Sequence, residues 1–294
     1  MAKAMAHKFG QVIGDLLEES IKPALKQFTD THGLYLDSQG PRKVRSGMKV
    51  TWKDAYGNKH DLDFVIERDG TENKIGIPVA FIETAWRRYT KHSKNKAQEI
   101  QGAIQPLLLA NEDSAPFIGV VLAGDFSEGS LTQLRSLGFK VIYFTYADVI
   151  KSFASIGVDA DYEEDTPDKD MMPRISALIH LSDEEKAQFA QSLMARKTDE
   201  THAFMDALDK AAKRTVELVR ILPLYGQYYN MSSVEEAISF IQKYKEDSAK
   251  CLIIKYEVEI QYNNGDNIRG KFSEKDTAIA FLRRHQLLTP ADVI

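Results

Sequence analysis

The pattern of apolar positions predicts helices and strands in a definite order in the first half of the chain. Apolar residues at helical spacing indicate one amphipathic helix over residues 6–28 and another over residues 92–110. Between the two helices, short alternating or apolar runs predict three strands, at residues 43–53, 62–66 and 79–82. The last two strands are joined across Asp69-Gly70, a sequence typical of a tight hairpin turn, so we expect them to be antiparallel.

Residues 117–123 are apolar without interruption, which is typical of a strand buried on both faces of a sheet. A helix near residues 127–137, a strand at 139–145 and a helix near 147–155 follow. The predicted order is therefore helix, three strands, helix, strand, helix, strand. Because a meander precedes strands that need crossover connections, the predicted fold class is α/β, of the α+β kind with a mixed sheet.

The second half of the chain is predicted to be mostly helical. The acidic, proline-containing residues 159–170 have the composition of a linker or an exposed loop. Beyond them the pattern predicts three helices, a β-hairpin and a last helix: residues 182–197, 199–221, 232–246, 252–272 and 273–285. We therefore predict two domains, residues 1–158 and residues 171–294.

The composition is that of an ordinary globular protein, with 43% hydrophobic and 28% charged residues. Cys251 is the only cysteine, which excludes an intramolecular disulfide and fits the reducing cytoplasm, where we expect the protein. No segment has the uninterrupted apolar length of a membrane span, so we expect no membrane partner. The first residues predict an amphipathic helix and not a signal peptide.

Charge is distributed unevenly along the chain. The net charge is −5 at pH 7, which by itself argues against a nucleic-acid partner. Binding depends on local charge, however, and residues 87–96 (RRYTKHSKNK) carry basic side chains without one acidic neighbour. Because helices exposed only to solvent usually mix both signs, this segment indicates phosphate binding.

Two acidic residues stand at the ends of neighbouring predicted strands. Asp63 opens one strand and Glu83 closes the next, so a hairpin would bring the two carboxylates together. Hydrolysis of a phosphodiester needs a divalent metal that activates water and offsets the charge on the phosphate. Mg²⁺ prefers carboxylate and carbonyl oxygens, so the predicted metal ligands are Asp63, Glu83 and the backbone carbonyl of Ile82.

The stretch HDLDFVIE and, after a turn, IPVAFIETAWRRYTKHSKNKAQEIQGAI resemble the PD-(D/E)xK nuclease superfamily, and within it the type II restriction endonucleases. The core of that family is a helix, a three-stranded meander that carries the acids, a helix and a further strand. The same order is predicted above for residues 6–145. The resemblance implies a restriction-endonuclease-like core, Mg²⁺ as the cofactor and double-stranded DNA as the substrate. The second domain would then serve DNA recognition or dimerisation.

The resemblance also assigns roles to single acidic residues. Asp63 matches the family's aspartate and Glu83 matches its second acid. Many members carry one more acid on the first helix, and either Glu18 or Glu19 matches it here.

The chain departs from the family pattern at Ala85, which stands where the family has a lysine two residues after the second acid. That lysine would orient or deprotonate the attacking water and stabilise developing charge. Some members take the group from the following helix, where Lys96 is the preferred substitute and Lys94 the second choice. A mechanism that uses the metal alone stays open.

The predicted function is Mg²⁺-dependent endonucleolytic hydrolysis of DNA, in a homodimer that cuts both strands of a symmetric site. The basic segment would hold the DNA backbone through four side chains: Arg87, Arg88, Lys91 and His92. Two alternatives stay open. One is a repair or mobile-element nuclease acting on structured DNA; the other is a catalytically inactive DNA-binding protein with a nuclease fold, which Ala85 would explain.

Overall fold

The computed structural model describes residues 2–112, 114–163, 166–224, 226–246 and 255–286. The chain divides into two compact units, Met1–Leu208 and Asp209–Ile294, each of which is described by itself. None of the helices within the described ranges is both long enough and apolar enough to cross a membrane.

The first unit begins with helix α1 (Ala2–His32) and is built on a five-stranded sheet in the order β1-β4-β5-β6-β7. The strands are β1 (Tyr35–Ser38), β4 (Phe64–Arg68), β5 (Ile77–Arg87), β6 (Phe117–Gly124) and β7 (Lys140–Thr145). Strand β4 is antiparallel to both of its neighbours, whereas β5, β6 and β7 run parallel. The sheet is mixed and the fold class is α/β, as the sequence predicts.

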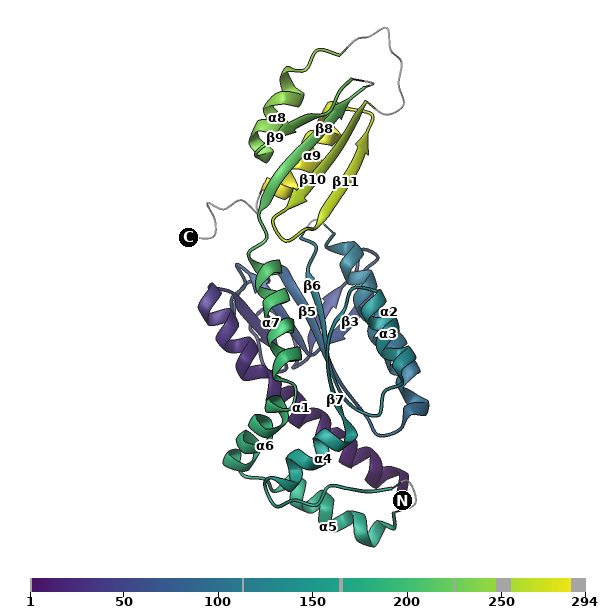
Figure 1. Ribbon diagram of the computed structural model, residues 1–294. Helices are drawn as coiled ribbons and strands as arrows, with labels where there is room; N and C mark the ends of the chain where they lie inside the picture. Colours follow the sequence, from purple (N-terminus) through teal and green to yellow (C-terminus); the bar gives the residue numbers. More distant parts are fainter. Residues whose placement is uncertain (1, 113, 164–165, 225, 247–254, 287–294) are drawn as a thin grey trace. The chain divides into compact units, whose positions relative to one another are not determined.

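Helices cover this sheet, with α1 packed along β5 (Figure 1). A large core cluster joins β4, β5 and β6 to α2 (Ser93–Ala110) and α3 (Glu128–Ser136). Helix α2 follows the short 3-10 helix η1 (Thr90–His92), and α4 (Tyr146–Ala154) follows β7. The apolar spacing predicted for α2 is confirmed, because its buried side chains repeat every three or four positions: Ala97, Ile100, Ile104 and Leu107.

The strand predicted at residues 43–53 is shorter than expected and lies outside the main sheet. Only its end forms β2 (Val50–Lys53), which pairs with β3 (Lys59–Leu62) in a separate two-stranded sheet. The edge of the main sheet is taken by β1, which the sequence pattern did not predict. Val50 and Leu62, at the base of the β2–β3 hairpin, belong to the main core cluster, so the hairpin is anchored there.

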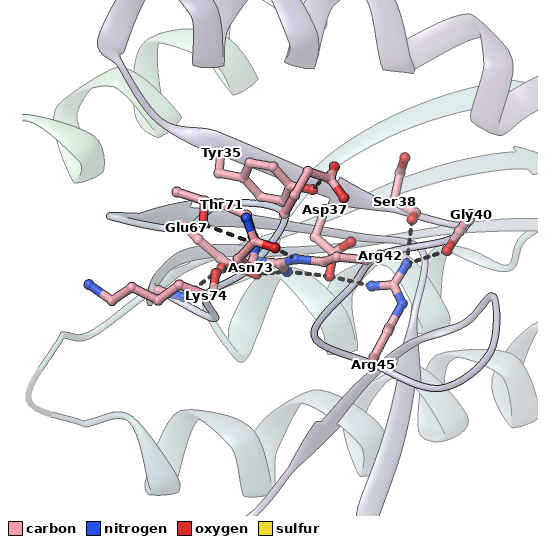
Figure 2. A network of polar contacts seen from close by, with 12 residues as sticks. Tyr35, Asp37, Ser38, Gly40, Arg42, Arg45, Glu67, Thr71, Asn73 and Lys74 are labelled. Carbon is pink, nitrogen blue, oxygen red and sulfur yellow. Dashed lines mark hydrogen bonds and ion pairs between the residues drawn. The ribbon is translucent and has the colours of Figure 1, made fainter.

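A buried ion-pair network fixes the β1 edge of the sheet (Figure 2). Arg42 donates to Asp37 of β1 at 2.7 Å and to both carboxylate oxygens of Glu67 of β4 at 2.6 and 2.9 Å. Glu67, which the sequence predicts as a solvated strand end, is therefore fully buried. Because removing one partner of a buried ion pair costs about 3–5 kcal/mol, this network ties the loop before β2 firmly to the sheet.

Helices α5 (Asp168–Ile179) and α6 (Asp183–Ala195) and most of α7 (Thr198–Ala212) also belong to the first unit. Both α5 and α6 pack against α1. Phe204 of α7 meets Phe117 at the start of β6 in an edge-on contact with ring centroids 5.0 Å apart. The predicted domain boundary between residues 158 and 171 is therefore wrong, because the helices beyond it pack on the first unit.

The second unit has its own four-stranded sheet, in the order β11-β10-β8-β9, and its own core. Its elements are β8 (Val216–Pro223), β9 (Tyr229–Met231), α8 (Val234–Lys243), β10 (Tyr256–Tyr262), β11 (Asn267–Phe272) and α9 (Lys275–Gln286). The terminal hairpin and last helix are confirmed. Most of the regular structure that follows residue 171 is helical, as predicted, but residues 216–221, expected at the end of a helix, instead form most of β8 between β10 and β9.

Candidate functional site

Asp63 and Glu83 lie opposite each other where the chain passes from the β2–β3 hairpin into the main sheet. Asp63 is the single bent residue between β3 and β4, and the next residue, Phe64, pairs with Ile82 of β5. One step further in the same antiparallel register places Asp63 across from Glu83. Directly opposed residues share a face of the sheet with Cβ atoms about 5 Å apart. The structure therefore brings the two predicted carboxylates together.

Thr84 fixes the orientation of Asp63. Its backbone N–H donates to Asp63 Oδ2 at 2.7 Å, and its hydroxyl donates to the same oxygen at 2.9 Å. Two donors on one oxygen hold the carboxylate in place and leave its other oxygen outside this contact. The sequence reasoning missed Thr84, and the only available signal was its position directly after Glu83.

Glu83 is a buried acid, with 7% of its surface exposed. Burial raises the pKa of Glu83 well above its usual value and the charge of Asp63 raises it further, whereas Lys96 and a hydrogen bond from the Asp63 backbone lower it. Its Oε1 atom has no hydrogen-bond partner. A buried carboxylate oxygen without a partner, beside a second carboxylate, is the environment that a bound cation would satisfy.

Glu18 of α1 is the third acid of the cluster. Burial raises the pKa of Glu18 to about 7, and the charges of Asp63 and Asp15 raise it in the same direction. Glu18 in turn raises the pKa of Glu83, so α1 and β5 contribute acids to one site. Glu19, the other candidate, is exposed and lies 3.9 Å from Lys186 of α6. The structure thus places Glu18 in the cluster and Glu19 outside it.

Lys96 reaches this cluster from α2, and Lys94 does not. The charge of Lys96 lowers the pKa of Glu83, and its side chain is 22% exposed, next to Glu99 at 3.7 Å. Lys94 is exposed. Ala85 lies in the core cluster with Ala97 of α2, so a small residue at position 85 lets this helix pack close to the sheet. A positive charge thus acts on Glu83 from α2, whereas β5 has Ala85 two residues after Glu83.

Ile82, the predicted carbonyl ligand, is a central residue of the sheet. It pairs with Phe64 of β4 on one side and with Gly119 of β6 on the other. Its side chain is fully buried. Its carbonyl lies one residue before Glu83, and its role as a ligand stays a prediction.

Arg88 is held inside the first unit and is poorly placed to hold DNA. Its guanidinium lies 3.7 Å from the ring centroid of Tyr146, donates to Asp125 at 2.9 Å and donates to the carbonyl of Tyr162 at 2.8 Å. Only 11% of its side chain is exposed. The contact of Arg88 with the DNA backbone stays a prediction, and in the structure this arginine ties the start of the acidic segment to the sheet.

The other predicted DNA-binding residues lie near the surface. Lys91 and His92 are exposed in η1, and the Lys91 amine lies 5.3 Å from the ring centroid of Tyr89. Arg87 is 34% exposed and lies 3.6 Å from Glu99. Local sequence could not separate Arg88 from these three residues, because its partners come from 37 and 74 positions downstream.

The site thus collects three carboxyl groups and one amine, from α1, β5, α2 and the residue that joins β3 to β4. Among the described residues, no group of three or more His, Cys, Asp or Glu side chains stands in the geometry of a metal site. A Mg²⁺ ion does not require such a cage, because it commonly keeps several waters and binds through one or two carboxylates. The pair formed by Asp63 and Glu83 fits that requirement.

Comparisons with known proteins give little further information. No family model matches the chain, and no curated protein matches it. One solved structure is similar, a protein of unknown function designated AF1548, at 13% identity over 65% of this chain and 99% of that chain, with a TM-score of 0.28.

Proposed function

We propose that this protein is a magnesium-dependent DNA endonuclease with its active site at Asp63, Glu83 and Lys96. The observation that supports this most is the Glu83 carboxyl group, which is buried beside Asp63 and has an oxygen without a partner. Strand ends do not retain such an arrangement for stability, because neighbouring buried carboxylates destabilise each other. A bound cation removes that conflict.

Asp63 and Glu83 are the residues that would hold Mg²⁺, with the carbonyl of Ile82 as a further ligand. When bound, the ion would lower the pKa of a coordinated water and offset charge on the phosphate. The two hydrogen bonds from Thr84 fix the orientation of the Asp63 carboxylate. Lys96 is the group that would orient the attacking water and stabilise negative charge as it develops.

Because the pKa of Glu18 is about 7, its carboxyl group would be partly protonated and partly ionised near neutral pH. In its ionised form, Glu18 would accept a proton from a water molecule at the site. Arg87, Lys91 and His92 would hold the DNA backbone near this cluster.

Type II restriction is the form of the activity that we propose, with duplex DNA cut at a specific site by a homodimer in the cytoplasm. The support for this narrower proposal is the resemblance of the HDLDFVIE and FIETAW segments to that family. A two-fold dimer would present two active sites to the two strands of a symmetric sequence.

The test is cleavage of plasmid DNA by the purified full chain with Mg²⁺, Mn²⁺ or EDTA. We expect metal-dependent cutting that is lost in Asp63→Ala and Glu83→Ala and retained in Glu19→Ala, which serves as the matched acidic control. Discrete, mappable fragments support restriction, whereas selective cutting of branched DNA supports the repair alternative.

A DNA-binding protein without activity is the second candidate, and Ala85 is the observation that favours it. If the wild-type chain binds duplex DNA but never cuts it with either metal, the nuclease proposal is rejected. Lys96→Ala separates the two cases further, since an inactive binder would lose at most one phosphate contact with that substitution.

A further inference from the structure

The β2–β3 hairpin leads directly into the proposed active site. We refer to residues 50–62, with their turn, as the arm. Its last residue, Leu62, is the neighbour of Asp63, so the arm and the acid pair are covalently continuous. The base is anchored by Val50 and Leu62 in the core and by Trp52, whose ring meets Phe81 edge-on at 5.6 Å.

The turn of the arm is held in one conformation by Asp54. One carboxylate oxygen of Asp54 accepts hydrogen bonds from the backbone N–H groups of Tyr56 and Asn58, both at 2.9 Å. The other oxygen accepts from the Asn58 side chain at 2.9 Å and contacts His60 Nε2 at 3.2 Å. Tyr56 is therefore presented from a fixed turn, and 90% of its surface is exposed.

The outer face of the arm is unusual in its charge. Lys53 and Lys59 lie directly opposite each other in the register, and both are exposed. Like charges at directly opposed positions destabilise a strand pair. Lys49 donates a hydrogen bond to Asp61 at 2.7 Å, and the charge of Lys59 also lowers the pKa of Asp61. The single negative charge of Asp61 therefore offsets only part of the positive charge of the two lysines. The face keeps a net positive charge.

The reach of the arm matches the dimensions of DNA. Lys59, Asp61 and Asp63 are alternate residues, and four residues of extended chain span about 13 Å. The major groove of B-DNA is about 12 Å wide. A phosphodiester at Asp63 would thus leave Lys53 and Lys59 within reach of phosphates across or along the groove, with Tyr56 beyond them.

We propose that the arm is a DNA-contacting element, in which Lys53 and Lys59 hold backbone phosphates and Tyr56 packs on a base or sugar. This inference rests on the proposed function, because it takes DNA as the substrate at Asp63. The exposed tyrosine suits stacking, which is tolerant of sequence, and the two lysines suit a point contact with phosphate.

The experiment measures binding of a fluorescent DNA duplex to the full chain by anisotropy, in EDTA, over a range of salt concentrations. The variants are Lys53→Ala with Lys59→Ala, Tyr56→Ala and Tyr56→Phe. The matched control is Lys151→Ala with Lys169→Ala, which removes two exposed lysines of α4 and α5. Equal thermal unfolding temperatures establish that each variant is folded.

The double lysine variant is expected to weaken binding by roughly tenfold and to lower the slope of log K against log salt by about 2, as two lost phosphate contacts require. Tyr56→Ala is expected to weaken binding by about 5-fold or more without changing the slope. Tyr56→Phe keeps the aromatic ring, so we expect it to bind as tightly as the wild type does. The control variant should bind as the wild type does.

The outcomes separate this inference from the function it rests on. A wild type that binds and cuts DNA, with arm variants indistinguishable from it, overturns the arm alone. A wild type that binds but never cuts, with weakened arm variants, overturns the nuclease proposal and supports the arm. A wild type that binds no duplex overturns both.

Discussion

Glu83 has more acidic neighbours than hydrogen-bond partners, and this imbalance governs the chemistry of the site. Its Oε1 atom is buried without a partner while the charges of Asp63 and Glu18 oppose its ionisation. Leaving a buried polar atom unsatisfied costs about 1–3 kcal/mol. A residue that destabilises the metal-free protein in this way is typical of a site where stability is given up for function.

Glu83→Gln should stabilise the metal-free protein and abolish cleavage. The amide keeps the shape of the side chain and removes the charge that opposes Asp63. We expect the melting temperature in EDTA to rise by about 2–4 °C for each kcal/mol recovered. The gain should be larger at pH 8.5 than at pH 5.5, because the raised pKa of Glu83 favours its protonated form as the pH falls. A melting temperature that falls equally at both pH values would contradict this account.

Metal binding should strengthen as pH rises through about 7, because Glu18 releases its proton in that range and the charge of the site then grows. The raised pKa of Glu83 makes metal binding depend on pH in the same direction. Glu18 has a raised pKa of about 7, against 4.5 in an unfolded chain. The folded metal-free protein therefore binds more protons than the unfolded chain in this window, and its stability falls as pH rises from about 4.5 to 7. Metal binding opposes that loss.

Calorimetric titration of Mg²⁺ in buffers of different ionisation enthalpy measures the proton release directly. We expect release near pH 6.5 in the wild type and a smaller release in Glu18→Gln. Glu19→Gln should leave the proton count unchanged, since Glu19 lies outside the cluster beside Lys186.

Thr84 is a positioning residue for Asp63, and its hydroxyl can be tested separately from its backbone. Thr84→Val keeps the shape and the backbone N–H donor but removes the hydroxyl that donates to Asp63 Oδ2. Outer hydrogen bonds to metal ligands typically contribute about 10–100-fold in affinity or activity. We expect a loss in that range in kcat/KM, with a weaker Mg²⁺ affinity, and recovery in Thr84→Ser.

Single residues were predictable where their partners lie nearby in sequence. Asp63 and Glu83 could be paired because one hairpin turn connects their strands. The buried state of Glu67 could not be predicted, since it depends on Arg42, 25 positions upstream. The contacts of Arg88 could not be predicted for the same reason, since they come from distant parts of the chain. The ring of Tyr146 covers its guanidinium, and Asp125 forms an ion pair with it.

At the scale of elements, buried strands and amphipathic helices followed the apolar pattern, whereas edge and ambiguous segments did not. Residues 216–223 carry apolar side chains that fit both a helical and an alternating period. These residues form a strand and not a helix because they pair with β10, and Val219 and Ile221 are buried in the resulting sheet. Strand β1 has four residues, too few to show a clear period.

In the proposed active site the lysine comes from α2 and not from β5, and the periodicity of α2 indicates which lysine that is. Lys96 adjoins the buried residue Ala97, and its charge lowers the pKa of Glu83, while Lys94 is exposed. General acid–base groups contribute about 10²–10⁴-fold to rates. We expect Lys96→Ala to lower kcat by at least 10²-fold and Lys94→Ala to change it by less than about 5-fold. Equal effects of the two substitutions would argue for a mechanism without a lysine.

At the scale of the whole molecule, the two units have separate hydrophobic cores. The core of the first unit joins β4, β5 and β6 to α2, and the core of the second joins β8 and β10 to α8 and α9. All the residues of the proposed metal site belong to the first unit. Packing defects in the second unit should therefore leave the metal site intact.

Ile221→Ala tests this separation. Ile221 is fully buried in the second core, and truncating such a side chain costs about 2–5 kcal/mol. We expect unfolding of the second unit to begin at a clearly lower temperature, while Mg²⁺ affinity at 20 °C stays within about 2-fold of wild type. Ile104→Ala is the matched change in the first core: Ile104 is a buried residue of α2 in the cluster that packs this helix against β5, the strand that carries Glu83, so we expect weaker Mg²⁺ binding. If Ile221→Ala also weakens Mg²⁺ binding, the second unit supports the site, and the two cores must be treated as one cooperative structure.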